Sequence, residues 1–183
     1  HWGVVPDMIC MAKGVSGGYA PLGAVAVGER IYGAFLNGSG RFAHGFTFGG
    51  NPVATAAGCA VIKYILANNL VDRAKERGRY LLGKLHALKE RYPAIGDVRG
   101  LGLMTGVEFV ADKESKQPFP AAAGLTDKIV NTALDLGLML YGASACADGT
   151  AGDAVIIAPP LTVSEAQIDE IMELFSQTLD RVL

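Results

Sequence analysis

The stretch PDMICMAKGVSGGY, residues 6–19, places one lysine between an apolar run and a cluster of glycines. The run Met8–Ala12 is short and apolar and follows Pro6-Asp7, a pattern that favours a buried strand. Lys13 then lies at the carboxyl end of that strand, the edge at which open α/β sheets bind ligands. The pattern therefore predicts an α/β fold with a candidate site at Lys13.

The chemistry available to Lys13 depends on its surroundings. Apolar walls disfavour the charged ammonium, and a neutral amine is the nucleophile that forms Schiff bases with carbonyl compounds. The glycines that follow would let the backbone approach a bulky planar ligand. The alternative is an ordinary surface lysine at a strand end. A nucleotide-phosphate loop is excluded, because that motif places its lysine after the glycines, whereas Lys13 precedes them.

A second candidate is HGFTFGGNP, residues 44–52, in which a glycine-flanked hydroxyl comes just before a predicted helix. Asn51 is a favoured N-cap residue, and Pro52 suits the first helical turn. Free N–H groups and the positive dipole end of a helix favour a phosphate, and Thr47 could add a hydroxyl donor. A loop and helix cap without a ligand explains the same residues, so both interpretations stay open.

The composition is that of a globular protein. The chain has 183 residues, of which 50% are hydrophobic and 19% charged, and its formal net charge is −2. These values exclude a disordered chain, and no basic block indicates a nucleic-acid partner. No apolar run reaches the roughly 20 residues of a membrane span, so we expect no membrane partner. Without an initiator Met or a signal-peptide pattern at His1, we expect the chain to start inside a longer sequence or to have been cut.

Cysteine usage indicates the compartment. Cys10, Cys59 and Cys146 are far apart and odd in number, which argues against a disulfide framework. Neither they nor the three histidines show the spacing of zinc ligands, so we expect no metal site. We therefore expect buried, reduced thiols in a cytoplasmic protein.

Hydrophobic periodicity predicts the remaining elements. Gly23–Val27 is a second apolar strand, a buried helix opens at residues 51–52, and a one-sided surface helix spans about 70–91. Further strands are expected over the ranges 98–110, 138–141 and 154–158, and helices over 126–136 and after a capping box at Ser164 and Gln167. Two helices on a few short strands form an α/β unit, so we predict domains over residues 1–90 and 91–183.

Taken together, several of these segments resemble one family. In chain order they are Asp7, MAKG (11–14), GGY (17–19), PLGA (21–24), HGFTF (44–48), NP (51–52), VRGLGLM (98–104) and APPLT (158–162). This order is similar to that of the class III, or omega-type, aminotransferases, which use pyridoxal 5′-phosphate (PLP), and it covers essentially the whole chain. The resemblance implies the C-terminal part of a fold type I PLP-transferase. Residues 1–90 would belong to the large cofactor domain and residues 91–183 to the small C-terminal α/β domain.

The resemblance also implies a role for each candidate residue. Lys13 would be the catalytic residue, holding the cofactor as a Schiff base and later moving the proton between the substrate carbon and the cofactor. Thr47 would bind the cofactor phosphate of the neighbouring subunit in a homodimer. Ser16 and Gly17, with the next glycine, would shape the wall beneath the cofactor. Phe46 is the remaining cofactor-binding candidate.

Two departures from the family pattern matter. The chain is less than half of a family member, and the phosphate-cradling loop, the ring-stacking aromatic and the aspartate that pairs with the pyridine nitrogen are expected upstream of Lys13. We therefore expect the polypeptide alone to bind cofactor poorly and not to turn over. In addition, Ile156 stands where many α-type members have an arginine that grips a substrate carboxylate, and no arginine occurs from Ser115 to Asp180.

The implied reaction transfers an amino group from an amine or omega-amino acid to a 2-oxo acid such as pyruvate. The stretch DGTAGD, residues 148–153, also resembles the omega-amino acid or amine:pyruvate branch. Two alternatives stay open. One is another PLP reaction on the same scaffold, by a racemase, an aminomutase or a decarboxylase; the other is a non-catalytic folded module. Arg99 is a weaker site candidate, which could instead brace the junction between the two lobes.

Overall fold

The computed structural model describes residues 2–183, and the chain divides into two compact units, His1–Asn69 and Leu70–Leu183. The division falls before the long helix α3 (Leu70–Arg91), which packs with the second unit. The sequence instead predicts a boundary at residue 90, and the assignment of this helix to the cofactor domain stays a prediction. Among residues 2–183, no single helix is long and apolar enough to cross a membrane, and α2 and α3 meet that criterion only when counted together.

The first unit is built on one pair of strands. Strands β1 (Met8–Ala12) and β2 (Gly23–Val27) pair antiparallel, with Met8 opposite Val27 and Ala12 opposite Gly23. A 3-10 turn, η1 (Lys13–Ser16), follows β1 directly. Helices α1 (Glu29–Asn37) and α2 (Pro52–Ala67) follow β2. Both strands and the helix at residues 51–52 are confirmed.

The apolar surfaces of this unit are largely open. Every residue of β1 and β2 is exposed, although the sequence predicts a buried strand over Met8–Ala12. In α2, Val53 and Leu66 are each 73% exposed, so the prediction of a buried helix is also wrong within residues 2–183. The three cysteines are unpaired as expected, but they are exposed rather than buried. An apolar pattern predicts that a face prefers burial without identifying the segment that buries it.

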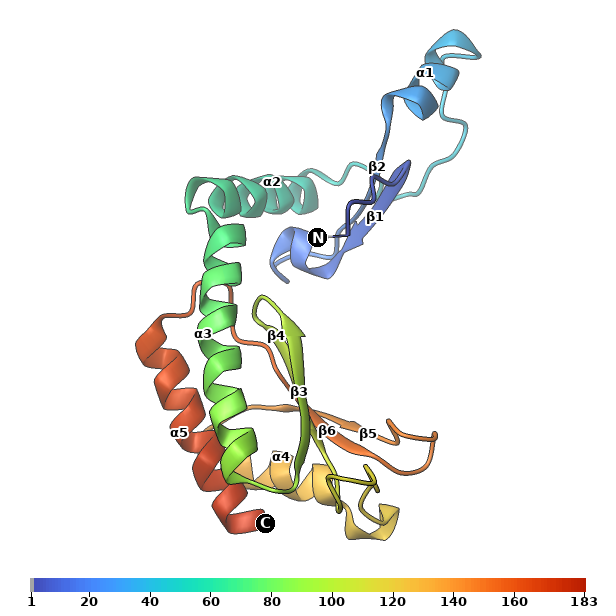
Figure 1. Ribbon diagram of the computed structural model, residues 1–183. Helices are drawn as coiled ribbons and strands as arrows, with labels where there is room; N and C mark the ends of the chain where they lie inside the picture. The colour runs from blue at the N-terminus through green and yellow to red at the C-terminus, as the bar shows by residue number, and fades with distance from the viewer. Residues whose placement is uncertain (1) are drawn as a thin grey trace. The chain divides into compact units, whose positions relative to one another are not determined.

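The second unit is a four-stranded antiparallel sheet with helices against one face (Figure 1). The strand order is β3 (Ile95–Leu101), β4 (Met104–Phe109), β6 (Asp153–Ile157) and β5 (Tyr141–Ser144). The helices are α3, α4 (Leu125–Asp135) and α5 (Glu165–Val182), and a short 3-10 turn, η2 (Ala121–Ala123), precedes α4.

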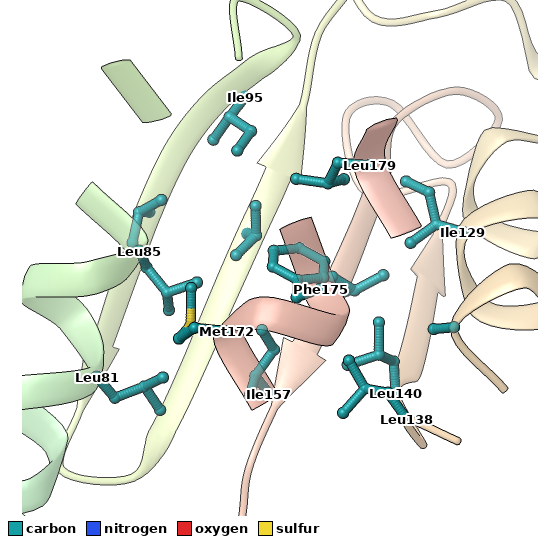
Figure 2. Packing of buried hydrophobic residues seen from close by; sticks show 14 of the residues in the cluster. Leu81, Leu85, Ile95, Ile129, Leu138, Leu140, Ile157, Met172, Phe175 and Leu179 are labelled. Atoms are coloured by element: carbon teal, nitrogen blue, oxygen red, sulfur yellow. The ribbon is translucent and has the colours of Figure 1, made fainter. Parts of the chain in front are cut away.

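The hydrophobic core of the second unit lies between the sheet and these helices (Figure 2). Val107 and Phe109 alternate along β4 and are fully buried, as their period-two spacing predicts. On α5, residues three or four positions apart form the predicted buried stripe, with Phe175 and Leu179 at its centre. Each fully buried side chain of this size contributes about 1.5–3 kcal/mol of transfer free energy, so this unit has substantial support of its own.

The capping box predicted for the last helix is confirmed, whereas one predicted strand is displaced. The capping box is present, since Gln167 N donates to Ser164 Oγ at 3.2 Å and Ser164 N donates to Gln167 Oε1 at 3.0 Å. The predicted strand over 138–141 is displaced, because β5 begins only at Tyr141. Leu138 and Leu140 are buried in the core without joining the sheet, so their alternation reports burial rather than strand pairing.

A long-range contact begins helix α4. Gly124, at the N-cap, has a left-handed backbone and offers no side chain. Asp153 of β6 supplies the missing acceptor, since its Oδ1 accepts from Thr126 N at 3.0 Å and from Thr126 Oγ1 at 2.7 Å. Asp153 is 7% exposed, and a buried carboxylate requires such donors. The two partners are 27 positions apart, so local sequence analysis does not predict this cap.

Helix α3 approaches the β3–β4 turn closely at one glycine. A Cβ built on Gly78 would overlap the backbone of Gly102, whereas a Cβ on Gly83 of the same helix would meet nothing within 4 Å. Only a residue without a side chain fits at Gly78, because the nearest atoms all belong to the backbone of Gly102.

We expect Gly78→Ala to lower the free energy of unfolding by about 1–3 kcal/mol through overpacking, although alanine is the better helix former. Gly83→Ala is the matched control and should raise it by about 0.5–1 kcal/mol. Urea unfolding followed by circular dichroism measures both. Equal stability of the two variants would contradict the close approach of α3 to Gly102.

Candidate functional site

Lys13 begins η1 with a left-handed backbone, at φ 53°. Ala12 before it is extended, with φ −154° and ψ −171°, so the chain turns sharply where the strand ends. The left-handed region costs an L-residue other than glycine about 1–2 kcal/mol. A lysine stays there only when the surrounding structure holds it, and such residues cluster at functional sites.

Glycines close the turn after Lys13. Gly17 and Gly18 have φ angles of 63° and 79°, in the region that favours glycine, and Gly17 N donates to Gly14 O at 3.1 Å. A Cβ on Gly17 would lie 3.2 Å from Val61 Cγ2 of α2, so this side of the turn is packed. A Cβ on Gly14 or Gly18 would meet nothing within 4 Å, so the turn is open on another side.

Ser16 is the buried member of the turn. It is 1% exposed, and its Oγ lies 2.5 Å from Ala20 O and 3.3 Å from Lys13 O. The hydroxyl proton is therefore used within the turn and is not available to a ligand. Any contribution of Ser16 to a cofactor site therefore comes through the shape of the backbone. The sequence alone does not distinguish this indirect role from direct binding by the hydroxyl.

The Lys13 side chain is exposed and forms no hydrogen bond or ion pair within residues 2–183. The apolar walls that the sequence leads us to expect around it are not provided by that part of the chain. Its amine is therefore not engaged by the described residues.

Phe46 and Thr47 lie in the loop between α1 and α2, in a turn closed by Gly49 N donating to Phe46 O at 2.9 Å. The Phe46 ring is 75% exposed and packs edge-on against His44, with 4.7 Å between the ring centroids. Thr47 is exposed, and its hydroxyl has no hydrogen-bond partner among the described residues. The Thr47 hydroxyl can therefore donate to a ligand.

The first turn of α2 leaves little room for an anion. Asn51 Oδ1 accepts from both Val53 N and Ala54 N at 3.1 Å, and Pro52 has no N–H group. Asn51 O accepts from Thr55 N at 3.0 Å. The predicted Asn51 cap is confirmed, so a phosphate here would depend on Thr47 and its loop rather than on the helix end.

The five predicted site residues fall into two groups. Lys13, Ser16 and Gly17 share the turn after β1, whereas Phe46 and Thr47 share the loop before α2. An apolar groove of about 1190 Å³ in the first unit runs from the strand pair to this loop; of the five, Phe46 alone lines it. The assignment of these residues to one cofactor site stays a prediction.

Arg99 on β3 is held by two carboxylates. Its Nη1 lies 2.9 Å from Asp97 Oδ2 and 2.6 Å from Glu108 Oε2. The hydrogen bond from Arg99 lowers the pKa of Asp97 below its ordinary value, and Lys89 Nζ adds a weaker contact at 3.5 Å from Asp97 Oδ1. These contacts lie within the second unit, and a role for Arg99 between the lobes stays a prediction.

Ile156 lies on the sheet face opposite to the helices. It faces Gly106 of β4 on one side and Tyr141 of β5 on the other, and it alternates with the buried Val155 and Ile157. This part of the face is apolar, and the guanidinium of Arg99 near it is already paired.

Comparison with known proteins assigns the family. The model of "Aminotransferase class-III" matches residues 1–179. The chain belongs to the class III aminotransferases. The uncharacterized aminotransferase YodT of Bacillus subtilis is 38% identical over 182 residues, which cover 100% of this chain and 41% of the relative. The acetylornithine aminotransferase of Clostridium acetobutylicum is 36% identical over 178 residues, covering 96% and 39%.

Solved transaminase structures have the same fold as this chain. An (S)-enantioselective omega-transaminase from Thermomicrobium roseum matches with a TM-score of 0.87 and 38% identity, covering 100% of this chain and 39% of that one. An amine transaminase from an uncultivated Pseudomonas species, in its PLP-bound internal aldimine form, matches with a TM-score of 0.87 and 36% identity, covering 100% and 40%. The predicted α/β fold of PLP-transferases is confirmed, and the chain spans about two fifths of the length of these relatives.

We expect the pKa of Asp97 to rise toward its ordinary value in Arg99→Met, because the main hydrogen bond that favours the carboxylate is removed. A lowered folded-state pKa stabilises the fold above the ordinary pKa, and this stability is lost as pH falls through the lowered pKa. The variant should therefore lose less stability in acid than the parent does.

Carboxyl-carbon NMR titration measures this pKa. Asp112 is the control, since its pKa is lowered by a hydrogen bond from Ser115 and should not change. An unchanged Asp97 titration in Arg99→Met would contradict the assigned ion pair.

Proposed function

We propose that the full-length protein containing this chain is a PLP-dependent aminotransferase and that Lys13 binds the cofactor covalently. The observation that carries the proposal is a free lysine amine, on a left-handed residue at a strand end, in a chain that belongs to the class III family over nearly its whole length. Amines of this kind form Schiff bases with aldehydes.

The residues present fit such a cofactor. The open side of the turn at Gly14 and Gly18 leaves space for a planar ring beside Lys13, and the packed side at Gly17 fixes the backbone beneath it. When bound, PLP supplies the aldehyde and the electron sink for amino transfer. Lys13 would bind the aldehyde carbon and, once released from it, would carry the proton to and from the substrate carbon.

Thr47 would hold the cofactor phosphate. Its hydroxyl is exposed and without a partner among the described residues, and it lies in the exposed loop between α1 and α2. We propose that this loop serves the neighbouring subunit of a homodimer, which is compatible with the exposed Phe46 ring beside it. Lys13 and Thr47 of one chain would then belong to different sites.

The proposed substrates are an amine or omega-amino acid donor and a 2-oxo acid acceptor such as pyruvate. The support is the apolar surroundings of Ile156 and the pairing of Arg99, which leave no free guanidinium on this face of the described sheet. A donor whose carboxylate lies next to the reacting carbon normally needs a bidentate partner of that kind. Two of the matching structures are described as an omega-transaminase and an amine transaminase.

We expect Lys13→Ala to lower amino transfer from an amine to pyruvate by about 1000-fold or more in the full-length protein, because the reacting amine is lost. Lys63→Ala is the matched control, an exposed lysine on α2, and should retain a rate within about twofold of the parent. Initial rates with matched donor and acceptor pairs measure both variants.

A Lys13→Ala rate near that of Lys63→Ala would contradict the proposed function. A parent that uses 2-oxoglutarate but not pyruvate would contradict the proposed acceptor while leaving the role of Lys13 intact.

A further inference from the structure

We propose that Ser16 is a positioning residue, whose buried hydroxyl holds the backbone of Lys13 in the left-handed conformation that aims the lysine side chain. The proposal rests on the proposed function, in which Lys13 is the reacting amine. It assigns Ser16 an action through Lys13 rather than a contact with cofactor or substrate.

The first argument is the location of the hydroxyl. The connection between β1 and β2 starts at Lys13, and Ala20 lies near its end. Ser16 Oγ lies 2.5 Å from the Ala20 carbonyl and 3.3 Å from the Lys13 carbonyl, so one side chain links both ends of this connection. A hydroxyl has one proton, and the shorter distance indicates that Ala20 O accepts it while Lys13 O is the nearby second acceptor.

The second argument is burial. Among residues 2–69, Ser16 is the one buried polar side chain, and its hydroxyl donates mainly to the Ala20 carbonyl, with the Lys13 carbonyl as the weaker second acceptor. Buried polar groups are costly when they lack a partner. Replacing Ser16 by an apolar residue leaves the Ala20 carbonyl without this donor and removes the second contact to the peptide group that follows Lys13, so both ends of the connection are held less firmly.

The third argument is the intrinsic preference of lysine. A residue with a Cβ favours negative φ, so a loosened turn would let Lys13 leave the left-handed region. That change redirects the Cα–Cβ bond at the end of β1. The lysine side chain is long, so a small rotation at its root displaces Nζ, and both bond formation and proton transfer need closely set reacting atoms.

The rest of the turn is supported independently of the hydroxyl. Gly17 packs toward Val61 of α2, and Gly58 of α2 leaves room for Leu22 and for the backbone of Val15. The hydrogen bond from Gly17 N to Gly14 O also does not involve the Ser16 side chain. We therefore expect Ser16→Ala to fold while losing control of the Lys13 backbone.

The test uses the full-length protein with Ser16→Ala, Ser16→Thr and Ser39→Ala. Ser39 is the matched control, because its Oγ lies 3.3 Å from Arg41 O in an exposed loop of the same unit. Two readouts are measured. One is the rate at which the cofactor-free protein forms the covalent bond with added PLP, followed by absorbance, and the other is kcat and KM for an amine donor.

We expect Ser16→Ala to lower both the rate of bond formation and kcat by about tenfold, equivalent to about 1.4 kcal/mol, with KM for the donor within about twofold of the parent. Ser16→Thr keeps the hydroxyl and should restore most of the rate. Ser39→Ala should match the parent in both readouts.

Rates for Ser16→Ala within about twofold of the parent would overturn the proposal, and so would a rise in KM alone, which indicates direct substrate contact. If circular dichroism shows that Ser16→Ala does not fold, Ser16→Cys is measured in its place. Parent-like rates for Ser16→Cys would overturn the proposal. A lowered kcat at constant KM would support it. Failure of the proposed function is distinguishable, because the parent itself would then form no borohydride-reducible bond on Lys13.

Discussion

The left-handed backbone of Lys13 is the constraint around which the first unit is arranged. An extended strand ends at Ala12, and Lys13 then adopts a left-handed backbone. This conformation is unfavourable for lysine unless the surrounding structure stabilises it. Three features hold it there: the glycine-closed turn, the buried hydroxyl of Ser16 and the packing of α2 against the turn. None of the three involves the lysine side chain, which makes no hydrogen bond or ion pair with the described residues.

The two units differ in how much of their own stability they contain. The second unit encloses a continuous apolar core between a four-stranded sheet and its helices. The starts of α5 and α4 are satisfied by the capping box at Ser164 and by the Asp153 side chain. The first unit exposes both strands and most of α2. An isolated pair of strands is only marginally stable in water, so the residues proposed to react lie in the unit that depends more on additional contacts.

Local sequence signals predict much of this structure. Short apolar runs predict β1, β2 and β6, the period of the apolar residues predicts β4 and the long helices, and the Ser164–Gln167 motif predicts the start of α5. Burial is less predictable, because the apolar pattern in Met8–Ala12 indicates that the strand prefers burial but not which segment covers it. For the same reason Leu138 and Leu140 suggested a strand three residues before β5 begins.

The candidate site is predictable in identity but not in geometry. The motif from Met11 to Gly18 singles out Lys13, and the Asn51-Pro52 pair predicts the cap that occupies the start of α2. Neither the left-handed φ of Lys13 nor the double contact of Ser16 follows from the sequence, since both depend on how the turn closes in three dimensions.

Mapping the covalent cofactor adduct tests the central claim most directly. The full-length protein is incubated with PLP, reduced with borohydride, digested and analysed by mass spectrometry. The account predicts that the pyridoxyl group is found on the peptide containing Lys13 and on no other lysine of the chain. An adduct on a different lysine, or a protein that remains unmodified, would contradict it.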